Sequence, residues 1–176
     1  MNLVIIGYRC TGKTTIGRIL AEKLGWELLD TDTLVQQRAG KSIKEIVADG
    51  GWPAFRTLEA AVVREVCLGG ERRIISFGGG TILPEANLAA AQQCGKIILL
   101  RAAAETIWQR MQSDHKTAGE RPSLTDKDGF AEVVHLLEER RKPYEAAADF
   151  AISTDRMGPD EIAGRILAWL KIHRLI

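Results

Sequence analysis

The stretch Gly7-Tyr8-Arg9-Cys10-Thr11-Gly12-Lys13-Thr14 decides the fold class, because it fits the pattern GxxxxGK[ST] in full. It follows an apolar run at residues 3–6 that predicts a strand, and it opens a stretch at 14–24 that predicts a helix. A glycine-rich loop between a strand and a helix presents backbone N–H groups to phosphate oxygens. The motif therefore predicts a P-loop that binds the phosphates of a nucleotide.

The side chains of this loop indicate how the phosphates are held. Lys13 supplies a mobile positive charge for the β- and γ-phosphates, and the Thr14 hydroxyl is placed to ligate Mg²⁺. A glycine-rich turn without a ligand is the alternative, and motif and context together argue against it. The expected nucleotide-binding residues of the loop are Gly7, Arg9, Cys10, Thr11, Gly12, Lys13, Thr14 and Thr15.

Short apolar runs alternate with helix-length stretches along the chain, which predicts an α/β fold with a parallel sheet. The expected strands are 3–6, 27–30, 73–77, 96–100 and 149–153. The expected helices are 14–24, 84–93, 103–112, 130–147 and 159–173, with helical pieces at about 33–68 broken by Gly40, Gly50, Gly51 and Pro53. Right-handed crossovers place helices on both faces, and ligands bind beyond the carboxyl ends of the strands.

Asp30-Thr31-Asp32 ends the second expected strand and has two interpretations. One is a strand end with an N-cap carboxylate for the next helix. The other is a pair of carboxylates at i and i+2, which point the same way from an extended strand. Beside a P-loop we favour the second, with one carboxylate near the Mg²⁺ shell and one accepting a proton or hydrogen bond from a substrate hydroxyl.

Two further motifs carry open alternatives. Arg56 and Glu59 stand i, i+3 on an expected helix, and this spacing alone favours a surface ion pair over a guanidinium aimed at a ligand anion. Gly78-Gly79-Gly80 follows a strand, and its cost in chain entropy favours close approach of a ligand to the backbone over a simple sharp turn.

The polar residues 113–128 carry no apolar period and predict a long loop. We expect a lid that closes over the nucleotide and brings Arg121 to the transferring group, and a flexible surface insertion is the alternative. The charge run Glu138-Glu139-Arg140-Arg141-Lys142 is typical of a solvated helix face.

Composition limits the class of protein. The net charge is 24 − 23 = +1, which argues against a protein that coats nucleic acid or an anionic membrane. Three cysteines are too few for a disulfide framework and lack zinc-site spacing. We find neither a signal peptide nor an apolar run of about 18 residues, so a reducing cytoplasm is the simplest compartment.

The order and spacing of these motifs resemble those of the shikimate kinase family over nearly the whole chain. The resemblance rests on GYRCTGKTT at 7–15, LLDTD at 28–32, FRTLE at 55–59, FGGG at 77–80, ERPSLT at 120–125 and EERRKPYEAAAD at 138–149. It implies one P-loop kinase domain over 1–176, with a five-stranded parallel sheet in the order 2-3-1-4-5. It also implies a substrate-binding segment at 33–61 and a lid at 113–128.

The resemblance implies transfer of the γ-phosphoryl group of ATP to the 3-hydroxyl of shikimate, with Mg²⁺, in aromatic amino acid biosynthesis. Asp32 then hydrogen-bonds the shikimate hydroxyls and acts as base, while Lys13 and Arg121 stabilise phosphoryl charge. Thr14, with Asp30 through water, holds Mg²⁺, and Arg110 stacks on adenine. The implied substrate-binding residues are Asp32, Phe55, Arg56, Glu59, Gly78, Gly79, Gly80 and Arg140. Because Pro143 stands one place later than is common, Arg141 is an alternative to Arg140.

Other functions compete with this one. A gluconate or nucleoside monophosphate kinase shares the motif, although the segment after the third strand, GGGTILPE, lacks the usual monophosphate-kinase pattern. A nucleotide switch of the GTPase class would need a guanine-reading motif, which we do not find. A nucleotide-binding module without turnover is the third possibility. We expect a monomer that acts on small molecules.

Overall fold

The computed structural model describes residues 1–113 and 129–176. The predicted lid, apart from Ser113, and with it Arg121 lie outside these residues. The described strands are β1 (Asn2–Ile6), β2 (Glu27–Asp30), β3 (Arg73–Ser76), β4 (Gly95–Arg101) and β5 (Phe150–Ser153). They form one parallel sheet in the order β2-β3-β1-β4-β5, which confirms the predicted fold class.

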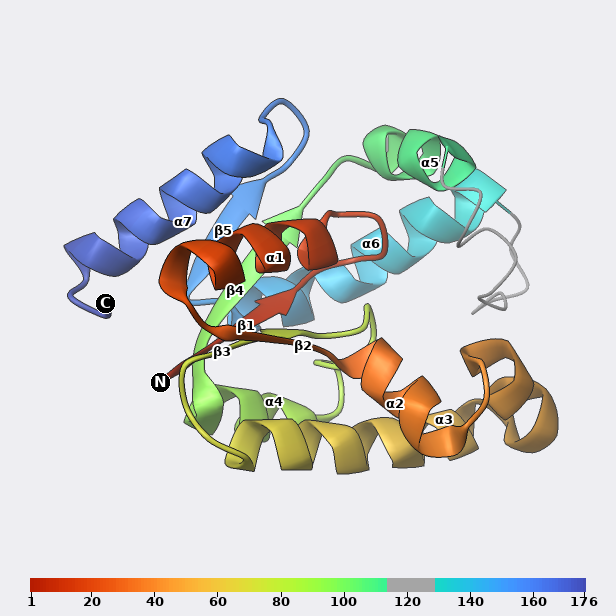
Figure 1. The fold of residues 1–176 in the computed structure, drawn as a ribbon. Coiled ribbons are helices and arrows are strands. Elements are labelled where there is room, and N and C mark those ends of the chain that lie inside the picture. Colours follow the sequence, from red (N-terminus) through yellow and green to blue (C-terminus); the bar gives the residue numbers. More distant parts are fainter. Residues whose placement is uncertain (114–128) are drawn as a thin grey trace.

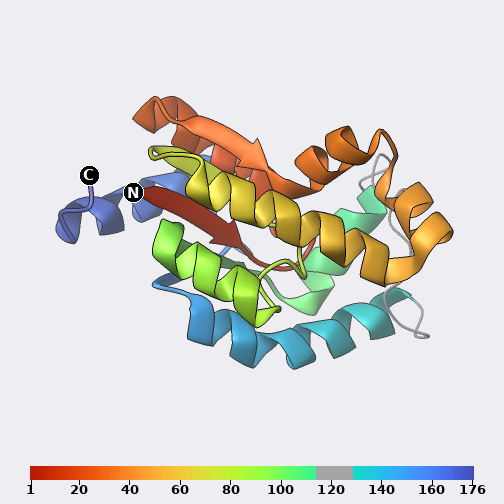
Figure 2. The ribbon, with the colours of Figure 1, turned by 90° about the horizontal axis from the view of Figure 1, so that it is seen from below.

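Helices cover both faces of this sheet. They are α1 (Lys13–Leu24), α2 (Thr31–Ala39), α3 (Ile43–Leu68), α4 (Glu85–Cys94), α5 (Ala104–Ser113), α6 (Gly129–Ala147) and α7 (Pro159–Ile172). Figure 1 shows α1 and α7 above the sheet, with α3 and α4 below it. Figure 2, seen from below, shows α3, α4 and α6 side by side across the lower face. None of the described helices is long and apolar enough to span a membrane.

An apolar core lies on each face of the sheet, because the central strand is buried on both sides. All five residues of β1 are buried, and successive side chains point to opposite faces. Leu3 and Ile5 therefore pack with α1 and α7, while Val4 and Ile6 pack with α3 and α4. Each fully buried aliphatic side chain contributes about 1.5–3 kcal/mol relative to an exposed one. Alternate side chains of β1 thus pack against the helices on both faces of the sheet.

The segment after β2 differs from the extended strand end that we favoured. Asp30 is the last strand residue and the N-cap of α2, since its carboxylate accepts a hydrogen bond from the Thr33 N–H at 3.2 Å. The helix therefore starts at Thr31, and Asp32 lies in its first turn. The strand-based argument for two carboxylates pointing the same way is wrong, because the N-cap turns the chain.

The long helix α3 contains the break that its sequence indicated. Ser42 and Glu45 form a capping box at its start, and the helix bends at Gly51, where φ is +69° and ψ is 180°. A side chain at this position would be strained, which accounts for glycine. The bend separates the first turns of α3 from the part that carries Arg56 and Glu59.

Candidate active site

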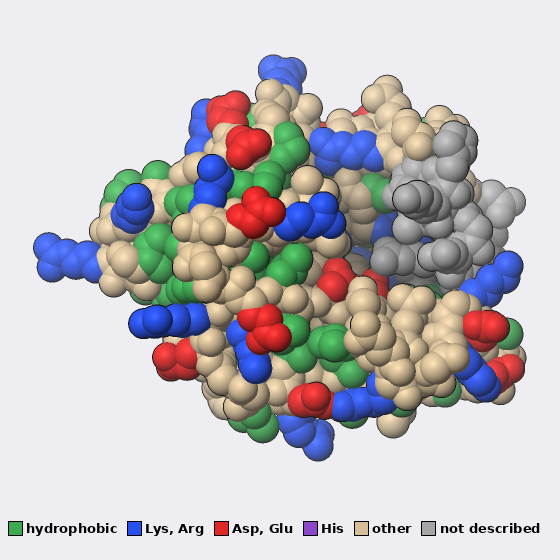
Figure 3. Space-filling view, viewed as in Figure 1, with side chains coloured by type: hydrophobic (Ala, Val, Ile, Leu, Met, Phe, Trp, Pro, Cys, Tyr) green, Lys and Arg blue, Asp and Glu red, His purple; other side chains and the backbone are tan. Residues whose placement is uncertain are grey.

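Two cavities adjoin at the carboxyl edge of the sheet. The P-loop cavity, of about 470 Å³, is lined by Arg9, Cys10, Gly12, Lys13, Thr14, Thr15, Asp30, Asp32, Ser76, Phe77, Trp108, Met111 and Gln112. The Arg56 cavity, of about 60 Å³, is lined by Tyr8, Arg9, Asp32, Ile43, Trp52, Phe55, Arg56, Glu59, Gly79, Gly80 and Arg140. Arg9 and Asp32 line both, so the two spaces meet at these side chains. In Figure 3 the surface is hollowed between α1 and α2.

The P-loop is closed on itself by Lys13. The Lys13 ammonium donates hydrogen bonds to the carbonyls of Gly7 at 2.9 Å and Tyr8 at 2.8 Å. At Gly7 φ is +143°, and a Cβ would lie 2.4 Å from the carbonyl oxygen of Leu100. The start of the loop therefore packs directly on the end of β4. Gly7 and Thr11 do not line the cavity, and the buried Thr11 hydroxyl donates to the Tyr8 carbonyl at 2.8 Å.

Thr14 and Asp30 place two oxygen donors together at the start of α1. The Thr14 hydroxyl donates to the Asp30 carboxylate at 3.2 Å, and both residues line the P-loop cavity. Hard oxygen donors of this kind suit Mg²⁺. The two residues therefore fit the metal that the P-loop motif predicts.

Arg56 and Glu59 form a partly buried pair. Arg56 donates to Glu59 at 2.5 Å, and the second oxygen of Glu59 accepts from the Thr81 hydroxyl at 2.5 Å. The Glu59 side chain is only 1% exposed, so the surface ion pair favoured by spacing alone is wrong. Burial raises the pKa of the Glu59 carboxyl, although the Arg56 charge and the Thr81 hydrogen bond act in the opposite direction.

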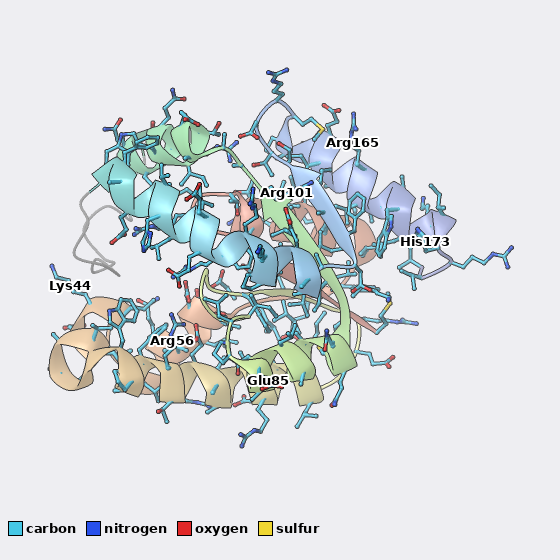
Figure 4. All side chains as sticks on the ribbon, turned by 180° about the vertical axis from the view of Figure 1, so that it is seen from behind. Lys44, Arg56, Glu85, Arg101, Arg165 and His173 are labelled. Carbon is cyan, nitrogen blue, oxygen red and sulfur yellow. The ribbon has the colours of Figure 1, made fainter. Side chains whose placement is uncertain are left out.

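Arg140 lies opposite, on α6. It is 5% exposed and donates to the carbonyl of Gly79 at 3.2 Å, beside the hydroxyl of Tyr144, which donates to the same carbonyl. Its neighbour Arg141 is exposed and lines a separate cavity of about 360 Å³. The solvated face predicted for this charge run is therefore wrong for Arg140. Figure 4 shows Arg56 in the space between α3 and α6.

The glycine turn makes room for the side chains of the site. A Cβ on Gly78 would lie 2.3 Å from Oδ1 of Asp32, and a Cβ on Gly80 would lie 2.5 Å from Nη2 of Arg56. A Cβ on Gly79 would lie 3.7 Å from Nη1 of Arg140. The sequence suggested close approach of a ligand to this backbone, and the structure shows close approach of three predicted site residues.

Arg110 is placed differently from the other predicted nucleotide-binding residues. Its guanidinium donates to the carbonyl of Cys10 at 3.1 Å, and to the hydroxyl and carbonyl of Thr154 at 3.0 and 2.7 Å. It does not line the P-loop cavity. These bonds tie the P-loop to the residue after β5.

Sequence reasoning missed several residues of the two cavities. Trp108, Met111 and Gln112 lie at i, i+3 and i+4 on α5, and this helical spacing could have indicated a shared face toward the P-loop. Glu132 has no local signal: it is 3% exposed on α6 and accepts a hydrogen bond from Arg9. Only the packing of α6 against the P-loop brings this pair together.

Comparison with known proteins agrees with the geometry. The model of the family described as shikimate kinase matches residues 9–171. A shikimate kinase of Oleidesulfovibrio alaskensis is 40% identical over 169 residues, which cover 96% of each chain. A shikimate kinase of Rhodopirellula baltica is 39% identical over 166 residues, covering 94% of this chain and 88% of its own.

Solved structures show the same likeness. The structure of shikimate kinase from Acinetobacter baumannii in complex with shikimate has a TM-score of 0.90 and 30% identity, covering 99% of this chain and 95% of its own. A gluconokinase from Sinorhizobium meliloti has a TM-score of 0.57 at 18% identity, covers 97% of this chain and 91% of its own, and shares the fold alone. On the family match and these identities, the chain belongs to the shikimate kinase family.

Proposed function

We propose that the chain is an ATP-dependent kinase that transfers the γ-phosphoryl group of ATP to the 3-hydroxyl of shikimate. Family membership supports the reaction. The observation that carries the substrate assignment is that Arg56 and Arg140 line one cavity, which meets the P-loop cavity at Asp32. An acceptor with a carboxylate at one end and hydroxyls at the other fits this arrangement.

The two arginines hold the carboxylate of the acceptor. A guanidinium binds a carboxylate through two parallel N–H bonds, which fix direction as well as distance. Glu59 restrains Arg56, and the Gly79 carbonyl restrains Arg140. Because both forks are held before the substrate arrives, little further side-chain freedom is lost on binding.

Asp32 orients the reacting hydroxyl and accepts its proton. Its carboxylate lies against Gly78 and lines both cavities, so a hydroxyl bonded to it faces the P-loop. Phosphoryl transfer requires in-line placement of the acceptor oxygen and the γ-phosphate more than covalent chemistry from the protein. A carboxylate clamped at one end and a hydroxyl held at the other would provide that placement.

Lys13 and the backbone of the P-loop hold the phosphates and stabilise charge on the transferred group. Thr14 and Asp30 would hold Mg²⁺, which when bound neutralises charge between the β- and γ-phosphates. The roles of Arg110 at adenine and of Arg121 over the phosphoryl group stay predictions, and Arg121 lies outside the described residues.

The same proposal covers the organisation of the chain. Residues 33–61 form the substrate-binding segment, since they comprise most of α2 and the part of α3 that carries Phe55, Arg56 and Glu59. We expect the protein to act as a monomer. The three free cysteines are consistent with a reducing cytoplasm.

A coupled assay of ADP release from MgATP tests the function. Shikimate should give saturable turnover, whereas gluconate and CMP should give only the rate measured without an acceptor. Lys13→Met is the negative control, since it removes the charge that binds the phosphates. This variant should still fold, which circular dichroism checks. Turnover with gluconate or CMP and none with shikimate would show that the acceptor is wrong.

A further inference from the structure

One arginine lies where the two cavities meet. The Arg56 cavity is lined by three arginines: Arg9, Arg56 and Arg140. Of these three, Arg9 alone also lines the P-loop cavity as the described residues form it, together with Lys13. Arg9 therefore lies at the end of the Arg56 cavity that faces the nucleotide, beside Asp32.

The backbone at Arg9 runs close to the glycine turn. The P-loop follows β1 and the turn at 78–80 follows β3, and these two strands are neighbours in the sheet. A Cβ on Gly79 would lie 3.5 Å from the amide nitrogen of Arg9 and 3.8 Å from the carbonyl oxygen of Gly7. A side chain that starts at residue 9 therefore lies between the loop that binds phosphates and the turn that lines the acceptor cavity.

Two contacts restrain the guanidinium of Arg9. Glu132 of α6 accepts a hydrogen bond from its Nη2 in an ion pair, and the side chains of Glu132 and Arg9 are only 4% and 16% exposed. The central carbon of the guanidinium lies 5.6 Å from the centre of the Tyr8 ring. Because the group is restrained before a ligand arrives, little side-chain freedom is lost when it binds an anion.

Arg9 keeps donors and charge for a ligand. A guanidinium has five N–H donors, and the bond to Glu132 uses one of them. The carboxylate of Glu132 offsets part of the positive charge, but Glu132 is not among the described residues that line either cavity. An anion at the junction of the cavities therefore meets the guanidinium before it meets the carboxylate.

Charge at this position distinguishes the product from the acceptor. The acceptor hydroxyl is uncharged, whereas a phosphate monoester carries about −1.5 to −2 charges near pH 7. During the transfer, negative charge is spread over the three equatorial oxygens of the phosphoryl group. A guanidinium between the nucleotide and the acceptor should therefore bind the group in transfer, and the phosphorylated product, more tightly than the acceptor alone.

We propose that Arg9 is a further catalytic residue, which binds the phosphoryl group as it passes from ATP to the acceptor, and that Glu132 is its positioning residue. In this step the acceptor oxygen forms a bond to the γ-phosphorus, the bond from that phosphorus to the ADP oxygen breaks, and the proton of the hydroxyl goes to Asp32. Arg9 donates hydrogen bonds and forms no covalent bond. This role rests on the proposed function, because it requires a phosphoryl group to pass between the two cavities.

Calorimetric titrations with shikimate and with shikimate 3-phosphate test this role. Arg9→Met should weaken binding of the phosphate ester about tenfold or more and binding of shikimate less than about threefold, because only the ester has the group that Arg9 binds. Arg18→Met, at an exposed position of α1, is the matched control and should change neither affinity. An equal loss for both ligands would overturn the role, since Arg9 would then bind a group common to both, and so would unchanged binding of the ester.

Single-turnover kinetics test the transfer step itself. Arg9→Met should lower the rate of transfer at saturating substrates about 100-fold, while the KM for shikimate changes less than about threefold. Arg9→Lys keeps the charge but loses the planar fork, so its rate should lie between those of the unsubstituted protein and Arg9→Met. A raised KM for shikimate with an unchanged rate of transfer would place Arg9 with the carboxylate-binding arginines instead.

A double variant keeps the test valid where Arg9→Met is unstable. Without Arg9 the Glu132 carboxylate is buried without this positive partner, which is destabilising. Arg9→Met, Glu132→Gln removes both charges and should discriminate between the two ligands as Arg9→Met does. Glu132→Gln alone should slow the transfer several-fold, but it should cause no further loss beside Arg9→Met, because Glu132 acts through Arg9. A further loss in the double variant would overturn the positioning role of Glu132.

Failure of this role and failure of the proposed function give different results. An unsubstituted protein that binds neither shikimate nor its 3-phosphate and shows no turnover would contradict the proposed function, and the role of Arg9 with it. An unsubstituted protein that phosphorylates shikimate, beside an Arg9→Met variant that does so at the same rate, would contradict the role of Arg9 alone.

Discussion

The guanidinium of Arg56 has neighbours on several sides that limit its position. Glu59 accepts one of its hydrogen bonds, and the rings of Trp52 and Phe55 lie 5.7 and 5.3 Å from its central carbon. Gly80 leaves the space into which Nη2 extends. These contacts fix the plane of the Arg56 guanidinium, which a positive charge alone would not require.

Arg56→Lys should therefore raise the KM for shikimate about tenfold or more and leave the KM for ATP nearly unchanged. Lysine keeps the charge but loses the second, parallel hydrogen bond to a carboxylate. Steady-state kinetics with each substrate varied in turn is the measurement. Arg64→Lys, at an exposed position of the same helix, is the matched control. An unchanged KM for shikimate would remove Arg56 from the substrate site.

Asp32 carries a different expectation, because it acts on the reacting hydroxyl. Asp32→Asn should lower kcat at least about 100-fold and weaken ATP binding little, since an amide accepts no proton at neutral pH. Single-turnover kinetics and equilibrium ATP binding check the two effects separately. Asp49→Asn, at an exposed carboxylate of α3, is the control. Equal loss of turnover and ATP binding would indicate a metal-binding or structural role instead.

The turn Gly78-Gly79-Gly80 joins β3 to the segment before α4, and its backbone is enclosed by charged side chains. Asp32, Arg140 and Arg56 each lie over one of its glycines. Three elements distant in sequence therefore meet on three consecutive residues that have no side chains. A Cβ on Gly78 or Gly80 would displace Asp32 or Arg56, whereas a Cβ on Gly79 would make only ordinary contacts at 3.5 Å or more.

Gly80→Ala should raise the KM for shikimate several-fold with little loss of stability. The added Cβ would meet the end of the Arg56 side chain at 2.5 Å, and a flexible guanidinium can move where a backbone cannot. Gly158→Ala is the control for the KM, because nothing lies within 4 Å of a Cβ there; as the N-cap of α7 it is expected to lose some stability. Kinetics and urea unfolding of both variants check the prediction, and a stability loss without a change in KM would contradict it.

Helices α7 and α1 each contain a glycine, and the two differ in their surroundings. Nothing lies within 4 Å of a Cβ at Gly164, which is exposed on α7, whereas a Cβ at Gly17 of α1 would meet Leu28 of β2 at 3.0 Å. Gly164→Ala should raise the free energy of unfolding by about 0.5–1 kcal/mol, from lower chain entropy in the unfolded state. Gly17→Ala should lack this gain. Urea unfolding of both variants is the measurement, and equal effects would contradict the packing argument.

For the whole molecule, the buried Glu59 of the site makes the free energy of unfolding depend on pH. Its pKa is raised above the usual 4.5, so between that value and the raised one the folded protein binds more protons than the unfolded chain. Within that window the contribution of Glu59 to the free energy of unfolding falls as pH rises. This sign is opposite to that of a carboxyl whose pKa is lowered by folding.

The stability of the unsubstituted protein should accordingly fall relative to that of Glu59→Gln as pH rises above 4.5. Glutamine keeps an acceptor for Thr81 but has no charge to bury, and all other titrating groups are common to both proteins. Urea unfolding at several pH values gives the difference. A difference that stays constant or changes in the other direction would contradict the raised pKa.

Much of this architecture was predictable from local pattern. The P-loop, the alternation of strands and helices and the breaks at Gly40 and Gly51 each depend on residues close together in sequence. Short-range constraints of backbone conformation and side-chain period produce such signals. The order of the strands came instead from the family resemblance, and the sheet confirms it.

Three features depended on packing between distant elements: the burial of Glu59, the inward face of Arg140 rather than Arg141, and the Arg9–Glu132 pair. Local pattern at Arg56 and Glu59 even favoured the wrong surroundings. A helix has several faces, and its own sequence does not determine which residue of a charged run will pack against another helix or strand. That choice is made when α3, α4 and α6 pack on the sheet, because only then does burial penalise every polar group left without a partner.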